Sequence, residues 1–448
     1  MAIITVFKFM EAINMEDFVY RWISLIGFFV ILCIAWITGT KTRINLKTIL
    51  GSIILAWTIG GLTFWLPWTR SIFQWLNNIL TSILQASQKG TVFLFGPLAI
   101  SPGQTLEDGT QSIGFILAMQ VLPSVIFFSA VISLLYYLGI IQTCVNQFSK
   151  IFQKSMGLSG VESFSAATSI FFGIESSLAI SKYLNKMTRS ELMTLITCMM
   201  ATVASTVMAI YVTALKDVFP QIAGHLISAS LISIPSAILI SKLSIPETIT
   251  KKRESINILI EESSLHKLSN SSQNNPSNII VALMDGGKMG VKLAISIATL
   301  LIIVLGLQEL TNLALKQIPI IFGHPLTINR ILSWACFPFT ILIGLRPDEW
   351  EIGSKILASR FIGTEVTAYF QIAAIQSNHT PIFSLRSLTI MIYSLCGFVH
   401  IASLGIFVGG LTAIVPSRAT EIFLLGLRGL WTAFLATLLT GCIAGVLA

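Results

Sequence analysis

Residues 157–184 read GLSGVESFSAATSIFFGIESSLAISKYL, and this stretch decides the fold of the chain. It is rich in glycine and serine, and it carries two carboxylates, Glu162 and Glu175, among apolar residues. An apolar helix needs roughly 20 residues to cross the hydrocarbon core of a bilayer, and neither half of this stretch is that long. The pattern therefore predicts a re-entrant hairpin with irregular backbone at its tip.

The composition of the whole chain indicates a membrane protein. Of its 448 residues, 54% are hydrophobic and only 11% are charged, whereas a soluble domain usually carries about 25% charged residues. Residues 68–84 contain Arg70 and two asparagines among apolar side chains, which predicts an amphipathic helix lying on the membrane surface. The predicted transmembrane helices are residues 22–37, 49–65, 113–138, 192–215, 226–243, 291–315, 388–411 and 422–447.

The net charge of +8 could indicate a nucleic-acid surface, but most basic residues lie between apolar stretches. Basic loops stay on the cytoplasmic side of a membrane, so we favour a topological role and expect no nucleic acid as partner. We expect a multi-pass protein of the cell inner (plasma) membrane. The basic loops place both termini on the extracytoplasmic side and make residues 246–277 a cytoplasmic linker. The six cysteines are scattered, so neither disulfides, zinc nor another cofactor is predicted.

The two halves of the chain repeat the same order of short motifs. An odd number of predicted crossings separates the two sets, so the repeat is inverted in the membrane, as in secondary transporters. The first set is Gly157-Leu158, Glu162, Gly173-Ile174-Glu175, Arg189-Ser190 and Ala204-Ser205. The second set is Gly344-Leu345, Glu349, Gly363-Thr364-Glu365, Arg386-Ser387 and Ala402-Ser403.

These patterns predict an all-α membrane protein with about eight transmembrane helices and two re-entrant hairpins. Residues 1–140 would form scaffold helices and the surface helix, and residues 141–245 the first repeat. Residues 246–325 would form the cytoplasmic linker and a further scaffold helix. Residues 326–448 would form the second repeat, with its own hairpin and two helices.

Glu175 and Glu365 lie next to glycines at the two predicted hairpin tips. An ionisable group at membrane depth is expensive and usually faces a cavity or a partner. Two carboxylates from opposite hairpins could accept hydrogen bonds from a polyol, bind a cation or relay a proton. Alternatively, each carboxylate caps backbone N–H groups at a helix break.

Further side chains carry alternative interpretations. His400, near Phe398 and Ser403, is by spacing alone more often a satisfied core group than a ligand, and Phe398 alone is most simply core. Thr202 and Ser205 could bind a cation through their hydroxyls and nearby carbonyl oxygens, or each hydroxyl could bond back to its own helix. No nucleophile–base motif accompanies the carboxylates, so a hydrolase is disfavoured.

Several ordered motifs resemble the concentrative nucleoside transporter family. The second half has Thr364-Glu365-Val366-Thr367-Ala368-Tyr369, which resembles the family's Asn-Glu-Phe-Val-Ala-Tyr. The resemblance covers most of the chain and is strongest after about Gly157. The other motifs are Gly160-Val161-Glu162-Ser163, Met187-Thr188-Arg189-Ser190-Glu191-Leu192, Met200-Ala201-Thr202, Cys396-Gly397-Phe398, Gly409-Gly410-Leu411 and Gly426-Leu427-Arg428.

The resemblance implies a homotrimer in which a transport domain moves like an elevator against a scaffold. It implies that Glu365 and Ser403 bind ribose hydroxyls and that Phe398 packs on the base. His400 stands where the family has an asparagine. Glu175 matches a glutamate of the first tip, but that tip is one residue shorter than in the family and lacks its base-reading glutamine.

The resemblance also implies a sodium site. Thr202 matches its side-chain ligand, and carbonyls near Ser169 and Phe172 would supply the other ligands. Some family members use protons instead, so the coupling ion is sodium or a proton. A neutral histidine donates and accepts hydrogen bonds as asparagine does, but it can also take a proton near physiological pH, so His400 could link transport to pH.

We therefore expect a symporter, not an enzyme, that imports a nucleoside-like molecule with a cation. The cation would order the first hairpin, and the ordered tip would complete the substrate site, so that both ligands favour the same state. One alternative is a transporter of another polar metabolite on the same scaffold. A membrane-embedded enzyme or sensor is a more distant alternative, because the sequence shows no nucleophile motif or metal cluster.

Overall fold

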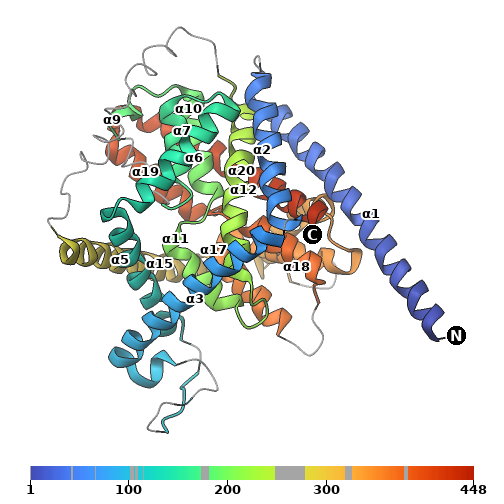
Figure 1. The fold of residues 1–448 in the computed structure, drawn as a ribbon, viewed down its shortest axis with the longest axis horizontal. Helices are drawn as coiled ribbons and strands as arrows, with labels where there is room; N and C mark the ends of the chain where they lie inside the picture. Colours follow the sequence, from blue (N-terminus) through green and yellow to red (C-terminus); the bar gives the residue numbers. More distant parts are fainter. Residues whose placement is uncertain are drawn as a thin grey trace.

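The computed structural model describes residues 2–41, 44–65, 67–100, 105, 109–114, 116–172, 181–247, 278–317, 325–377 and 382–448. Helices dominate this part of the chain, and the N-terminal half of α1 extends away from the other helices (Figure 1). The first half contains α1 (Ala2–Ile37), α2 (Leu46–Trp65), α3 (Pro67–Phe95), α4 (Leu117–Gln120), α5 (Leu122–Tyr137), α6 (Ile140–Met156), α7 (Gly160–Thr168), α9 (Ser181–Leu184), α10 (Arg189–Ala201), α11 (Ser205–Leu215) and α12 (Ile222–Ser244). The second half contains α15 (Ile279–Leu315), α16 (Ile328–Leu342), α17 (Trp350–Gln376), α18 (Leu385–Leu395), α19 (Ile401–Ile414) and α20 (Ala419–Leu447), with short 3-10 turns at Gly96–Ala99, Pro347–Glu349 and Pro416–Arg418.

Six helices of the described chain are long and apolar enough to cross a membrane. They correspond to six of the eight predicted crossings. The other two predictions, 192–215 and 388–411, were wrong in one respect: each is broken in the middle into two shorter helices, α10 with α11 and α18 with α19. The six continuous spans are Phe18–Ile37, Leu46–Trp65, Leu117–Tyr137, Ile222–Ser244, Ile279–Leu315 and Pro416–Leu447.

The first break, between α10 and α11, contains no glycine or proline that would predict it from the sequence. α10 ends at Ala201, Thr202 has extended backbone (φ −117°, ψ 163°), and α11 begins at Ser205. The backbone N–H of Ser205 donates instead to the carbonyl oxygen of Phe171, at 3.2 Å. A contact with a distant segment therefore satisfies the group that the break frees, and this contact cannot be read from local sequence.

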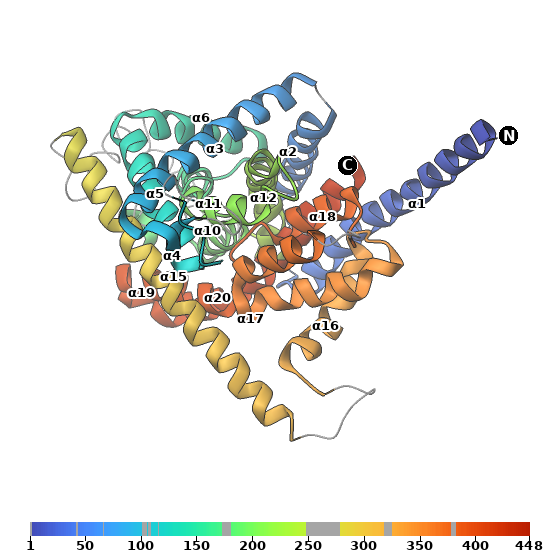
Figure 2. The ribbon, with the colours of Figure 1, turned by 90° about the horizontal axis from the view of Figure 1, so that it is seen from below.

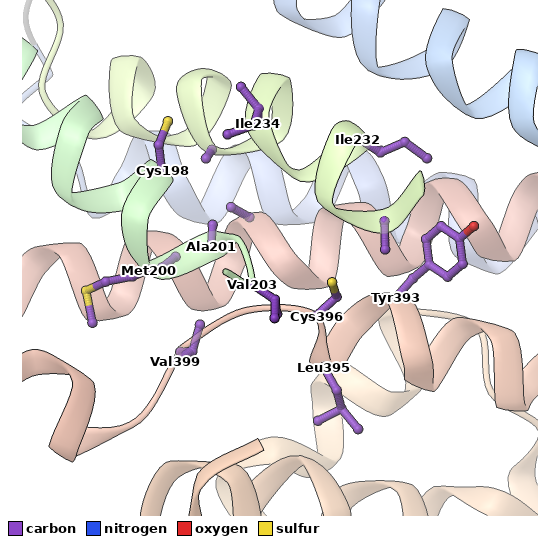
Figure 3. Packing of buried hydrophobic residues seen from close by; sticks show 14 of the residues in the cluster. Cys198, Met200, Ala201, Val203, Ile232, Ile234, Tyr393, Leu395, Cys396 and Val399 are labelled. Atoms are coloured by element: carbon purple, nitrogen blue, oxygen red, sulfur yellow. The ribbon is translucent and has the colours of Figure 1, made fainter. Parts of the chain in front are cut away.

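The second break, between Leu395 and Ile401, lies directly against the first. A Cβ atom placed on Gly397 would lie 3.0 Å from the carbonyl oxygen of Ala201, so glycine is needed for this close approach. Figure 3 shows Ala201 and Val203 beside Cys396 and Val399. The interrupted parts of both halves therefore meet in the buried centre of the protein.

The second predicted hairpin is present within α17. The helix is interrupted at Thr364, where φ is 74° and ψ is 163°. The Ser359 hydroxyl donates to the Gln371 side-chain oxygen at 2.9 Å, although 12 residues of straight helix would separate them by about 18 Å. The chain therefore turns back at Thr364, and the two legs of the hairpin lie side by side. The first hairpin contains α7 and α9, and its tip, residues 173–180, lies outside the described residues.

Helix α1 shows that the repeat is inverted. Near the start of its membrane span, the Arg21 guanidinium donates to the carbonyl of Ala448, the residue that follows α20 (2.8 Å). Just after α1 ends, the backbone N–H of Thr40 donates to the carbonyl of Ser244, at the end of α12 (2.9 Å). Residues 18–37 of α1 form a membrane span, so α12 and α20 end on opposite sides of the membrane.

A pair of helices, α5 and α15, packs against one side of the repeats, in contact with α11 and α17. α5 and α15 pack along each other on the side of the molecule opposite α1 (Figures 1 and 2). Gly286 and Gly290 of α15 face Ala130 and Ile126 of α5, and small residues at this spacing let membrane helices approach closely. By contrast, α1 packs on α20, and α2 packs on α12.

Candidate functional site

The carboxylate of Glu365 lies immediately after the interruption at Thr364, and its side chain is 3% exposed. The Tyr211 hydroxyl, from α11, donates a hydrogen bond of 2.6 Å to Oε1 of Glu365. The Nε2 atom of His400, at the second helix break, lies 3.1 Å from Oε2. The site thus joins a hairpin tip and half-helices from both repeats.

One buried oxygen atom at this tip, Oγ1 of Thr364, has no hydrogen-bond partner among the described residues. Oε2 of Glu365 has the Nε2 atom of His400 beside it, at 3.1 Å. An unsatisfied buried polar atom costs about 1–3 kcal/mol. Thr364 also has a backbone conformation that a β-branched residue rarely adopts, and such strain of about 1–3 kcal/mol is concentrated at functional sites. This tip therefore suits a ligand that brings its own hydroxyl groups.

The hydrogen bonds of His400 fix which nitrogen carries the proton. His400 is the N-cap of α19, and its Nδ1 accepts the backbone N–H of Ser403 at 3.0 Å. A nitrogen that accepts a hydrogen bond carries no proton, so the proton of the neutral ring is on Nε2. His400 therefore presents an N–H donor toward Glu365, and adding a second proton would break the cap of α19.

Ser403 and Phe398 lie in the same turn. The Ser403 hydroxyl is 2.5 Å from the carbonyl oxygen of Phe398 and 2.7 Å from that of His400, so its proton is used within the turn. The hydroxyl oxygen also accepts the backbone N–H of His400, at 3.3 Å. The Phe398 ring lies 6.4 Å from the His400 ring, edge to face. The structure thus brings together four of the predicted substrate residues: Glu365, Phe398, His400 and Ser403.

A second cluster of oxygen atoms lies at the first helix break. Oγ1 of Thr202 is 2.9 Å from the carbonyl oxygen of Ser169 and 2.8 Å from that of Cys198. The Thr202 hydroxyl has one proton and can donate it to only one of these carbonyl oxygens, so the other carbonyl oxygen faces a lone pair of Oγ1. Converging hydroxyl and carbonyl oxygens suit a hard cation. The side chain of Phe172, the third predicted cation residue, is partly buried against the hydrophobic core, with its ring 5.9 Å from that of Tyr136.

Tyr211 is a site residue that the sequence did not predict. Tyr211 lies in the apolar run Ala209-Ile210-Tyr211-Val212, where nothing distinguishes a functional tyrosine from a packing one. Its ring stacks on Tyr369 with a centroid distance of 4.7 Å, which aims the hydroxyl at Glu365. Glu175, the fifth predicted substrate residue, lies outside the described residues.

Comparisons with known proteins agree with this architecture. Families described as the N-terminus of Na+ dependent nucleoside transporters, as nucleoside recognition, and as the C-terminus of Na+ dependent nucleoside transporters match residues 26–98, 118–217 and 225–445. The nucleoside permease NupC of Helicobacter pylori is 30% identical over 430 residues, which cover 94% of this chain and 97% of that protein. The chain belongs to the concentrative nucleoside transporter family.

Other members of the concentrative nucleoside transporter family support the same conclusion. Solute carrier family 28 member 3 of Mus musculus is 32% identical over 417 residues, which cover 90% of this chain and 54% of that longer protein. The structure of CNTnw in an inward-facing substrate-bound state matches with a TM-score of 0.83 and 28% identity, over 96% of this chain and 98% of that one. The predicted fold, an all-α transporter, is confirmed.

Proposed function

We propose that this protein imports nucleosides by symport with a cation. The observation that carries this proposal is the Glu365 carboxylate, buried in a membrane-embedded hairpin tip with one oxygen bonded by the Tyr211 hydroxyl and the other 3.1 Å from Nε2 of His400. A ribose hydroxyl would donate to that second oxygen, and another ribose oxygen would accept from Nε2–H of His400. The nucleobase would pack on Phe398, whose ring is partly exposed.

Sodium is the cation that the ligand atoms favour. A hydroxyl and backbone carbonyls, such as those of Thr202 and Ser169, do not take up a proton near neutral pH, but they bind a hard cation well. The family descriptions name Na+ as well. Coupling to a proton would instead use a titratable group such as Glu365 or His400, and uptake driven by a proton gradient without sodium would favour that alternative.

Helix α11 connects the two sites. Its first residue, Ser205, bonds the carbonyl of Phe171 beside the cation cluster, and Tyr211, six residues later, bonds Glu365. Six helical residues rise about 9 Å. A cation that orders the end of α7 would therefore position α11 and so orient Glu365, which makes cation and substrate binding mutually favourable.

The packing suggests which parts move. We propose that α5 and α15 form the scaffold, and that the repeats move against them in an elevator-like motion. α1 and α2 pack on α20 and α12, so they would move with the repeats. This assignment differs from the predicted division, which placed all of residues 1–140 in the scaffold. We also propose a homotrimer in the cell inner membrane; cross-linking in intact membranes tests the trimer.

The orientation in the membrane is part of the proposal. The contact of Arg21 with Ala448 supports termini on one side, and the basic loops support the extracytoplasmic side. Cysteines introduced near residue 21 and at the C-terminus should both react with a membrane-impermeant reagent added outside cells. Protection of either cysteine would count against this topology.

Uptake into proteoliposomes tests the function directly. Radiolabelled uridine or adenosine should accumulate when sodium is high outside and should not accumulate without a cation gradient. A specific sequence feature, the missing base-reading glutamine in the first tip, also supports a different polyol as substrate. Competition by a panel of nucleosides, bases and sugars separates these two substrates; sugars that compete better than nucleosides would exclude the nucleoside proposal.

A further inference from the structure

Arg360 is a fully buried charge outside the substrate and cation clusters. Its side chain is 0% exposed, and it is among the largest fully buried side chains of the described chain. It lies on the first leg of the second hairpin, five residues before Glu365. A buried charge in a membrane domain is expensive and usually functional, so its partners are informative.

The guanidinium of Arg360 binds the end of a half-helix. Nη1 donates to the carbonyl oxygen of Ser394 at 2.5 Å and to the Thr437 hydroxyl at 3.2 Å, and Nη2 donates to the carbonyl oxygen of Gly397 at 3.0 Å. Ser394 and Gly397 flank the end of α18 at the second break. The C-terminal end of a helix carries a partial negative charge and unpaired carbonyls. Arg360 therefore neutralises this end in the way that a bound cation would.

The contacts of Arg360 exclude a simple ion pair. Among the described residues, the hydrogen bonds of its guanidinium go to two backbone carbonyls and one hydroxyl and not to a carboxylate, and its Nε has no hydrogen-bond partner. Its charge is thus directed at backbone carbonyls. Backbone carbonyls of this kind also coordinate ions in cation sites. Here the positive charge among them is the guanidinium of Arg360 instead of a bound ion.

The first repeat has the same break but no fixed charge at the matching place. The carbonyl of Ala201, at the end of α10, accepts from the Ser233 hydroxyl at 2.5 Å, and that of Cys198 accepts from Thr202. In sequence, the residue five places before the matching glutamate, Glu175, is Ile170 instead of arginine. Among the described residues, the side chains that bond these two carbonyls are therefore neutral hydroxyls, and the proposed cation cluster lies at this break.

We infer that Arg360 is a built-in cation of the second repeat. The second repeat has the same helix break as the first, and without Arg360 this break would hold a second cation. Because Arg360 occupies that place, a single cation is carried with each substrate molecule. This inference rests on the proposed symport. Because Arg360 is covalently attached and returns with the protein, the net charge moved in one cycle is that of the single coupled cation.

The first test counts cations in the purified wild-type protein. Equilibrium binding of radioactive sodium in detergent should saturate at one ion per chain, and in proteoliposomes one positive charge should enter with each nucleoside. Two sodium ions per chain, or two charges per nucleoside, would overturn the inference. The binding measurement does not require transport. An absence of nucleoside uptake would contradict the proposed function, and the number of sodium ions bound per chain would still test this inference.

The second test removes the charge. Arg360→Ser leaves room beside the Ser394 and Gly397 carbonyls, and we expect a second sodium ion to bind there. Its transport at low sodium should fall roughly ten- to a hundredfold, as for loss of a charged hydrogen-bond donor, and rising sodium should restore it with a steeper concentration dependence. Arg360→Lys keeps the charge and should retain the wild-type ion count.

A matched control lies on the same helix. Lys355 is 53% exposed and pairs with Glu351, so Lys355→Met removes a positive charge from the same leg without touching the break. It should leave both the ion count and the sodium dependence unchanged. An Arg360→Ser protein that folds, binds a single sodium ion and keeps wild-type sodium dependence would contradict the inference. If Arg360→Ser does not fold, the wild-type count decides.

Discussion

Tyr211 and Glu365 are 154 positions apart in the chain, and a hydrogen bond of 2.6 Å joins the tyrosine hydroxyl to the carboxylate. The bond connects a half-helix of the first repeat to the hairpin tip of the second. It uses one oxygen of Glu365, and the other oxygen lies 3.1 Å from Nε2 of His400. The geometry of the candidate substrate site is therefore set jointly by both repeats, and changes in either repeat should alter binding.

Glu365→Gln should weaken nucleoside binding. The change keeps the size of the side chain but removes the negative charge that a ribose hydroxyl would bond. Hydrogen bonds to charged groups contribute roughly 1.5–3 kcal/mol, so Kd should rise by roughly ten- to a hundredfold. Isothermal titration of purified protein measures this change. Glu351→Gln on the same hairpin is a control, because Glu351 is 77% exposed; equal effects of both variants would contradict the site.

Tyr211→Phe should affect both ligands. The variant keeps the ring stacked on Tyr369 and removes only the donor to Glu365, at a cost of roughly 1–3 kcal/mol for a buried acceptor left unsatisfied. Nucleoside affinity should fall, and the sodium concentration needed for half-maximal uptake should rise, because α11 links the two sites. Uptake measured across a grid of sodium and nucleoside concentrations separates the two effects. A loss of nucleoside affinity with unchanged sodium dependence would show that α11 does not couple them.

His400→Asn should make transport less sensitive to acid. The Nδ1 atom of His400 accepts the N–H of Ser403, so a second proton can be added only by breaking the cap of α19. Wild-type uptake should therefore fall as the medium is acidified. Asparagine can also cap a helix and does not bind a proton, so the variant should give a flatter profile. An equally steep profile would assign the acid sensitivity to another group.

Thr202→Ala should weaken sodium dependence selectively. It removes the hydroxyl ligand, worth roughly 0.5–1.5 kcal/mol, and should raise the sodium concentration for half-maximal uptake by roughly two- to tenfold. Nucleoside affinity at saturating sodium should stay close to wild type. Thr213→Ala is the matched control, because the Thr213 hydroxyl bonds back to Ala209 within its own helix. A similar shift in both variants would indicate a general helix effect instead of a cation ligand.

The sequence could predict the large features because they depend on local patterns. Apolar length gives the membrane spans, and the glycine-containing motif around Glu365 marks the hairpin tip that Ser359 and Gln371 confirm. It could not predict features set by packing between repeats. The break after Ala201 lacks glycine and proline, and its freed N–H is satisfied by Phe171. Arg360 lies in a short helical leg where its distant carbonyl partners become visible only in three dimensions.

Thr364→Gly should raise the unfolding temperature of the protein and lower its affinity for nucleoside. The φ angle of 74° at Thr364 is strained for a β-branched residue and costs about 1–3 kcal/mol, and glycine adopts it freely. The variant should therefore unfold at a higher temperature in the absence of substrate. It also removes the buried hydroxyl that has no partner among the described residues, so nucleoside affinity should fall. Thermal unfolding with and without nucleoside measures both effects, and the stabilisation that nucleoside adds should shrink. A variant that is stabilised and binds nucleoside as well as wild type would show that the strain at the hairpin tip has no role in binding.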